Sequence, residues 1–103
     1  MTIYALSSGP GLSGVAVIRL SGPNSKEVIQ KLTKSNPPKP RYASLKKIYK
    51  IDKNELIDEG LVLWFPAPNS YTGEDMAEFH IHGSRASINA LQSEISKFND
   101  CRL

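Results

Sequence analysis

Apolar and polar residues alternate along the chain in short segments, and most of these segments predict strands. Residues 3–6 form an apolar run that ends in Ser, Gly and Pro, and residues 14–20 are rich in β-branched side chains. Both patterns are typical of strands that lead into loops. Arg19 is the one charge in the second run, and we expect it to lie in a buried strand.

Helical spacing appears twice. Val28, Ile29 and Leu32 share one face of residues 24–34, which predicts a first helix. Its end is set by the three prolines of residues 35–40, which exclude a helix or a central strand there. The second predicted helix covers 84–98, where four apolar residues recur at amphipathic spacing: Ile88, Leu91, Ile95 and Phe98.

Three further strands are predicted between the helices. Residues 43–51 and 56–65 flank a polar turn and are expected to form a hairpin. A proline-rich loop over 66–73 then leads to a strand at 76–82, and 101–103 resembles the start of another strand. Strands in runs between only two helices indicate an α+β domain with a mixed or antiparallel sheet.

Length and composition limit the possibilities. The 103 residues, 40% hydrophobic and 22% charged, suit one globular domain over 1–103. The longest uncharged apolar run, residues 60–68, is too short to span a membrane, and the first residues do not resemble a secretory signal. A lone Cys101 excludes an intramolecular disulfide and a cysteine-rich zinc site. We therefore expect a cytoplasmic protein.

Charge is divided unevenly between the two halves of the chain. Residues 1–50 carry a net charge of +8, and residues 51–103 carry −5. A basic half could contact nucleic acid or could pair with the acidic half of a second copy. The simpler interpretation, which we favour, is that the lysines between 46 and 53 decorate a solvated strand edge.

Nucleotide motifs are weak or missing. Residues 9–14 match G-x-G-x-x-G, but a strand is predicted after them where the dinucleotide fingerprint needs a helix. A loop whose backbone approaches a ligand is the better interpretation. The chain contains no Gly-Lys pair, which excludes a phosphate-binding P-loop.

Catalytic and metal-binding patterns are also weak. His80 and His82 share a strand face with Glu78, but a zinc site usually needs three or four protein ligands, so we expect hydrogen-bonded histidines and no metal. Glu74 and Asp75 are expected in a solvated turn. None of these side chains has an evident activating neighbour in the sequence, and we assign no catalytic residue.

Four strings, in order along the chain, are more specific than these patterns. They are Gly14 to Pro23 (GVAVIRLSGP), Lys39 to Ala43 (KPRYA), Phe65 to Asp75 (FPAPNSYTGED) and Glu78 to Gly83 (EFHIHG). Together they resemble the N-terminal domain of the MnmE/TrmE family of tRNA modification GTPases, over nearly the whole chain.

The resemblance implies a fold and a function. It implies a domain similar to the folate-binding domain of the glycine-cleavage T-protein, which forms a homodimer and binds 5-formyl- or 5,10-methylene-tetrahydrofolate. It further implies a full-length protein with a GTPase domain that uses GTP, Mg²⁺ and K⁺. That protein modifies the wobble uridine of tRNA together with an MnmG-type flavoprotein.

The resemblance places the folate contacts on Arg19 and Glu78. A pterin presents an N–H beside an amino group, and one carboxylate can accept from both. The alternative is that Arg19 and Glu78 only pair with each other.

The chain also departs from the family pattern. A third family ligand, a lysine, would follow Leu103, Ser84 replaces the second glycine of the family H-G-G string, and the GTPase and C-terminal cysteine motifs are missing. We therefore expect a domain truncated at its C-terminal end, without a GTPase and without catalysis of its own. Two alternatives stay open: a stand-alone folate-dependent enzyme of the aminomethyltransferase type, and a non-catalytic assembly or tRNA-contact module.

Overall fold

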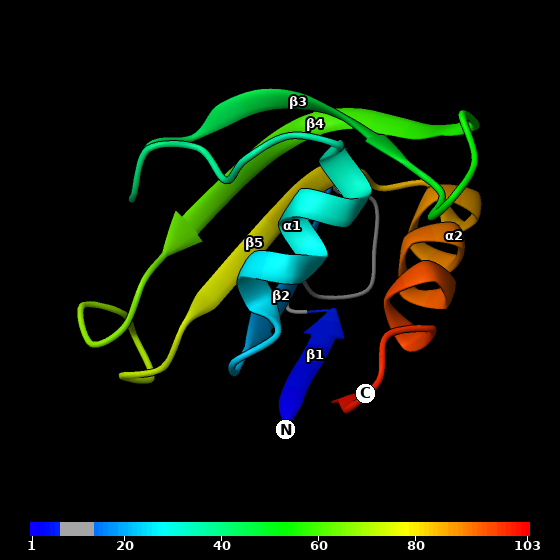
Figure 1. Cartoon of the computed structure of the whole chain (residues 1–103). Coiled ribbons are helices and arrows are strands. Elements are labelled where there is room, and N and C mark those ends of the chain that lie inside the picture. The colour runs from blue at the N-terminus through cyan, green and yellow to red at the C-terminus, as the bar shows by residue number, and fades with distance from the viewer. Residues whose placement is uncertain (7–13) are drawn as a thin grey trace.

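Two helices pack on one face of a six-stranded mixed sheet in the computed structural model, which describes residues 1–6 and 14–103 (Figure 1). This arrangement confirms the predicted α+β class and the predicted order of elements. The glycine-rich segment 9–14, apart from Gly14, lies outside the described residues. The elements are β1 Thr2–Leu6, β2 Val15–Ser21, α1 Ser25–Thr33, β3 Ser44–Tyr49, β4 Leu56–Phe65, β5 Met76–His82, α2 Arg85–Ser96 and β6 Cys101–Arg102.

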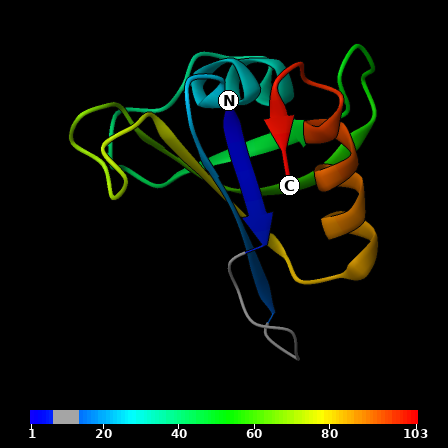
Figure 2. The same ribbon diagram turned by 90° about the horizontal axis from the view of Figure 1, so that it is seen from below.

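The strands lie in the order β3-β4-β5-β2-β1-β6. Neighbouring strands are antiparallel except β1 and β6, which are parallel and lie side by side near both chain ends (Figure 2). The predicted hairpin is confirmed, since β3 pairs with β4. β3 is an edge strand, and Lys46 and Lys47 lie on it as the charge pattern suggested.

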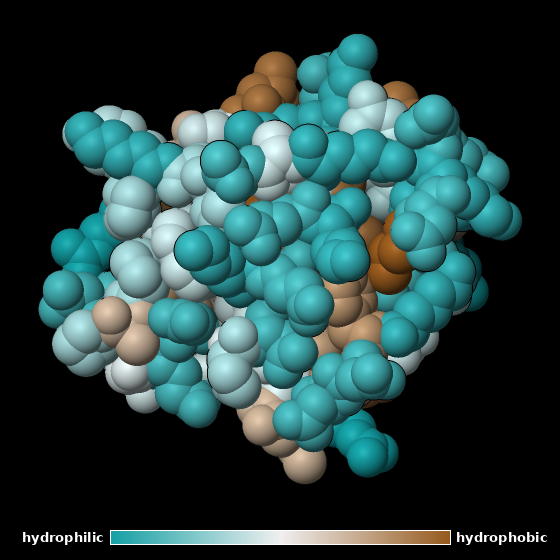
Figure 3. Space-filling view, in the orientation of Figure 1, coloured by the Kyte–Doolittle hydropathy of each residue, from teal (hydrophilic) through white to brown (hydrophobic). Residues whose placement is uncertain are grey.

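One face of the sheet makes the core, because alternate residues of each strand point to it. In β2 these are Ala16, Ile18 and Leu20, and in β5 they include Phe79 and Ile81. Both helices bury their apolar stripes against this face. The outer surface on this side is mainly hydrophilic, and apolar groups show between α1 and α2 and at the upper edge of the view (Figure 3).

Arg19 corrects one prediction. It lies in β2 between Ile18 and Leu20, but its side chain is 43% exposed and points away from the core. The expected burial of this charge is wrong because the helices cover only one face of the sheet. Arg19 is therefore on an uncovered face, where an arginine can remain partly solvated.

Gly60 allows β4 and β5 to approach closely. A Cβ atom at this position would lie 2.2 Å from the backbone carbonyl oxygen of His80, far inside contact distance. A glycine inside a strand often marks such a close backbone approach. Any side chain here would force the two strands apart next to the residues described below.

The helix ends differ slightly from expectation. Asn24 precedes α1 without a side-chain capping bond; its backbone N–H donates instead to Oγ1 of Thr2, at 2.7 Å. Ser84 caps α2 by accepting from the N–H of Ser87, and α2 ends at Ser96, so Phe98 packs on the core from beyond the helix. No helix in the described ranges has the length and apolarity to cross a membrane.

Candidate functional site

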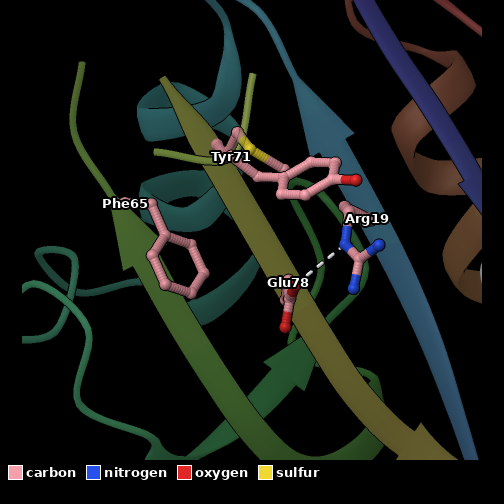
Figure 4. Close-up of a pocket in the computed structure, with 5 residues that line it drawn as sticks. Arg19, Phe65, Tyr71 and Glu78 are labelled. Atoms are coloured by element: carbon pink, nitrogen blue, oxygen red, sulfur yellow. Dashed lines mark hydrogen bonds and ion pairs between the residues drawn. The ribbon is translucent and has the colours of Figure 1, made fainter. Parts of the chain in front are cut away.

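A cavity of about 370 Å³ opens on the uncovered face of the sheet (Figure 4). It lies where β2, β4 and β5 meet the loop after β4. Glu78 lies between Phe65 on one side and Arg19 on the other, and the ring of Tyr71 projects over the same space. The lining residues are Arg19, Phe65, Tyr71, Met76 and Glu78.

Strand register brings the two charged residues together. Arg19 of β2 is directly opposite Glu78 of β5, 59 residues later in the chain. Directly opposed residues of antiparallel strands have side chains on the same face, about 5 Å apart at Cβ. The two residues that the family resemblance selected are therefore neighbours.

The Glu78 carboxylate is held at both oxygens. The Nε–H of Arg19 donates to Oε2 at 2.8 Å, and Nε2 of His80 lies 2.9 Å from Oε1. The Glu78 side chain is 14% exposed. Burial acts to raise the pKa of Glu78, but the hydrogen bonds from His80 and Arg19 outweigh it and hold the pKa below its usual value. Glu78 is therefore an anion at neutral pH.

The ion pair of Arg19 and Glu78 leaves several hydrogen-bond donors and acceptors unused within the described residues. A carboxylate offers about four lone-pair directions, and a guanidinium has five N–H donors. Within the described residues, the bonds to Arg19 and His80 use two of the acceptor directions of Glu78, and Arg19 uses only its Nε–H. The pair can therefore exist in the folded protein and still bind a ligand that carries both donors and acceptors.

The loop over residues 66–75 is tied internally and to β2. Oδ1 of Asp75 accepts from the backbone N–H of Ala67 at 2.8 Å, and the hydroxyls of Thr72 and Ser21 lie 2.7 Å apart. These bonds hold the segment that carries Tyr71. Asp75 is thus a structural side chain of the loop and not a free carboxylate.

The expected hydrogen bonding of the two histidines is confirmed, since each has a carboxylate partner. His80 pairs with Glu78, and Nδ1 of His82 lies 2.8 Å from Oδ1 of Asp58. The backbone N–H of His82 also donates to Asp58. Burial acts to raise the pKa of Asp58, and the bonds from His82 outweigh it and lower that pKa. No group of three or more His, Cys, Asp or Glu side chains suited to a metal ion occurs in the described part of the chain.

Sequence reasoning missed several members of these clusters. Phe65 and Met76 are cross-strand partners, and a pattern along the chain cannot reveal that pairing. Asp58 lies 24 residues from His82 and is brought to it by the pairing of β4 with β5. Met76 could have been found, because it alternates with Glu78 and His80 on one face of a strand.

A second, more apolar groove of about 360 Å³ lies on the same uncovered face. Val15 of β2, Leu45 of β3 and Leu61 of β4 contribute its apolar part, and each is at least 40% exposed. His80 and His82 lie along its floor. The uncovered face thus carries both a charged pocket and an exposed apolar surface.

Comparison with known proteins identifies similar chains. The family model described as the GTP-binding protein TrmE N-terminus matches residues 2–103. The tRNA modification GTPase MnmE of Pelagibacter ubique is 63% identical over 103 residues, which cover all of this chain and 23% of that protein.

Two further relatives are similar over most of this chain. The mitochondrial 5-taurinomethyluridine-[tRNA] synthase subunit GTPB3 of Danio rerio is 58% identical over 90 residues, covering 87% of this chain and 18% of that protein. MnmE of Brucella anthropi is 49% identical over 102 residues, which cover 99% of this chain and 23% of that protein. The chain therefore spans less than a quarter of these relatives.

Proposed function

This chain belongs to the TrmE/MnmE N-terminal domain family, and from that premise we propose that it binds a tetrahydrofolate derivative and forms a homodimer. In a full-length protein, this domain supports wobble-uridine modification of tRNA in the cytoplasm, together with an MnmG-type flavoprotein. One observation carries the folate proposal: Arg19 and Glu78 meet in a cavity between two aromatic side chains.

The chemistry of the cavity suits a pterin. A carboxylate with open lone pairs can accept from the ring N–H and the adjacent amino group together. Phe65 and Tyr71 offer apolar faces to a flat ring, and the remaining N–H groups of Arg19 can donate to ligand oxygens. A cavity of about 370 Å³ also lies in the usual range for small-ligand sites. The proposed ligand is 5-formyl- or 5,10-methylene-tetrahydrofolate.

Titration with 5-formyltetrahydrofolate tests this proposal. Glu78→Gln replaces one acceptor with a donor that faces the donors of the pterin, at nearly the same size. A charge-assisted hydrogen bond contributes about 1.5–3 kcal/mol, so we expect affinity to fall roughly 10- to 150-fold. Arg19→Lys keeps the charge but loses the planar fork, and should also weaken binding.

A matched control separates the ligand role from the ion pair. Glu59→Gln removes the same charge from β4, outside the cavity, and should leave affinity unchanged. Thermal melting of each variant reports the alternative. If Arg19 and Glu78 only pair with each other, both substitutions lower the melting temperature while folate affinity stays at the wild-type value.

The homodimer is proposed for the uncovered face. The exposed side chains of Val15, Leu45 and Leu61 supply apolar surface there, and the opposite charges of the two chain halves favour self-association. Light scattering at high micromolar concentration and low salt should give the mass of a dimer. A monomer under those conditions would refute this part of the proposal.

A second candidate function is folate-dependent group transfer by this chain, as in aminomethyltransferases. The observation that favours it is the pair of Asp58 and His82, because a carboxylate that orients an imidazole is a common feature of acid–base sites. His82 is four residues from Glu78 along β5, about 13 Å at the usual strand rise. One-carbon transfer lost in His82→Asn, with folate affinity retained, would support this candidate. Turnover equal in both proteins would contradict it.

A further inference from the structure

Among the described residues, Glu78 is the hydrogen-bond partner that joins His80 to the ligand pocket. Its side chain shares a face of β5 with Glu78, two residues further along, and Nε2 lies 2.9 Å from Oε1 of that carboxylate. The residues opposite it on the two neighbouring strands are apolar, Val17 on β2 and Leu61 on β4. His80 does not line the cavity, so its route to a ligand is indirect.

A glutamate needs such support if its carboxylate is to bind in one orientation. The torsion that rotates a carboxylate is broad, unlike the staggered torsions before it. Within the described residues, Arg19 makes a single hydrogen bond to Glu78, through Nε, and its side chain is 43% exposed. One contact to one oxygen leaves the carboxylate free to turn about that contact. A second hydrogen bond to the other oxygen, from a different direction, fixes its plane.

We propose that His80 is a positioning residue: by donating from Nε2 to Oε1 of Glu78, it fixes the carboxylate plane that receives the paired donors of a flat ligand. This inference rests on the proposed function, in which the ligand is a pterin. It requires the proton of His80 to be on Nε2.

Two substitutions at one position test the hydrogen bond. His80→Leu removes the donor at similar volume, and we expect roughly 3- to 10-fold weaker binding of 5-formyltetrahydrofolate, less than for Glu78→Gln because the Glu78 carboxylate itself remains. His80→Gln keeps an N–H donor at similar reach, and we expect it to restore affinity to near the wild-type value. Equal affinity of wild type and His80→Leu overturns the proposal, and so does failure of glutamine to restore binding.

His82→Leu is the matched control. It removes the same chemical group from the same face of β5, but His82 pairs with Asp58 and not with Glu78. We expect folate affinity to be unchanged. A loss equal to that of His80→Leu would show that any imidazole on this face matters, which contradicts a specific role for His80.

A double variant decides whether His80 acts through Glu78 or contacts the ligand itself. If it only positions Glu78, adding His80→Leu to Glu78→Gln should cost no further affinity, since residues that act as a unit are not additive. A further loss in the double variant would mean that His80 contacts the ligand, and the positioning role would be wrong.

A readout without folate keeps this inference separate from the proposed function. The pKa of Glu78 can be measured by NMR, from the ¹³C shift of its carboxyl carbon as pH is varied. This pKa should be higher in His80→Leu than in the wild type, because the His80 hydrogen bond helps to lower it. It should not change in His82→Leu. If the wild type binds no folate but this shift is seen, the proposed ligand fails and the positioning of Glu78 stands. An unchanged Glu78 pKa in His80→Leu overturns the inference whatever the ligand.

Discussion

Carboxylates on the two faces of the sheet differ in their hydrogen-bond partners and in what surrounds them. On the helix-covered side, the Glu94 side chain of α2 is buried and accepts from the backbone N–H of Ile51 and from Nζ of Lys97. On the uncovered side, Glu78 is bonded to two side chains at the edge of a cavity. Both carboxylates are satisfied, but only Glu78 has acceptor capacity that faces open space.

The difference indicates which charges serve the fold and which serve binding. Glu94 connects α2 to the turn between β3 and β4, and one of its two partners is the backbone N–H of Ile51 in that turn. Glu78 connects two strands that backbone hydrogen bonds already join. Loss of Glu94 should therefore destabilise the protein, whereas loss of Glu78 should mainly change ligand affinity.

The largest effect on stability is expected from the centre of the covered face. Phe79 is fully buried in β5, between Glu78 and His80, whose side chains lie on the opposite face. Phe79→Ala should lower the free energy of unfolding by about 3–5 kcal/mol, through lost burial and the cavity left behind. Urea unfolding measures this. A loss below about 1 kcal/mol would mean that the covered face is not the main core.

Glu94→Ala should follow, with a loss of about 1–3 kcal/mol, because the N–H of Ile51 would be left without its acceptor. Folate affinity should not change, since Glu94 is on the opposite side of the sheet. Glu94→Gln, which keeps an acceptor oxygen, serves as the control and should recover part of the loss. A fall in folate affinity with Glu94→Ala would break the proposed separation of the two faces.

Protonation of Glu94 at low pH should also lower the free energy of unfolding, by less than Glu94→Ala does. Burial acts to raise the pKa of Glu94, but the bonds from Lys97 and Ile51 lower it. Its contribution to stability is therefore complete above the unfolded-state value of about 4.3, and is lost as pH falls through the lower folded pKa. Below about pH 4.3, Glu94→Gln should lose stability less steeply than the wild type, by urea unfolding at each pH. Parallel curves would contradict this prediction.

The elements of the fold could be predicted because each strand and helix has a local pattern. The 76–82 strand and the hairpin of β3 and β4 were found from alternation and turn residues. The face that each strand exposes could not be read in the same way. β2 is apolar on both faces, so only the position of the helices shows that Arg19 points outward.

The candidate site could be predicted only in part, for the same reason. Motif resemblance selected Arg19 and Glu78, and the register of β2 and β5 brings them together. The partners of the two histidines depend on pairings between strands that are distant in sequence. His82 with Asp58 is an example, since no spacing rule along one strand predicts a partner on another.

The smallest effect is expected from Leu61 of β4, whose neighbour Val62 points to the opposite face. Leu61 is 40% exposed on the uncovered face, and Val62 is fully buried on the covered face. Leu61→Ala should change the free energy of unfolding by less than about 0.5 kcal/mol, as is usual for surface positions. Val62→Ala removes two buried methyl groups and should cost about 1.5–2 kcal/mol, although it deletes fewer atoms.

Protein concentration sharpens this last comparison. If the homodimer forms through the uncovered face, Leu61 is buried in the dimer, and the cost of Leu61→Ala should grow as the protein concentration rises from low to high micromolar. The cost of Val62→Ala should stay constant, because its contacts lie within one chain. Urea unfolding at several concentrations measures both. A Leu61→Ala cost that is independent of concentration, in a protein shown to dimerise, would place the interface on another surface.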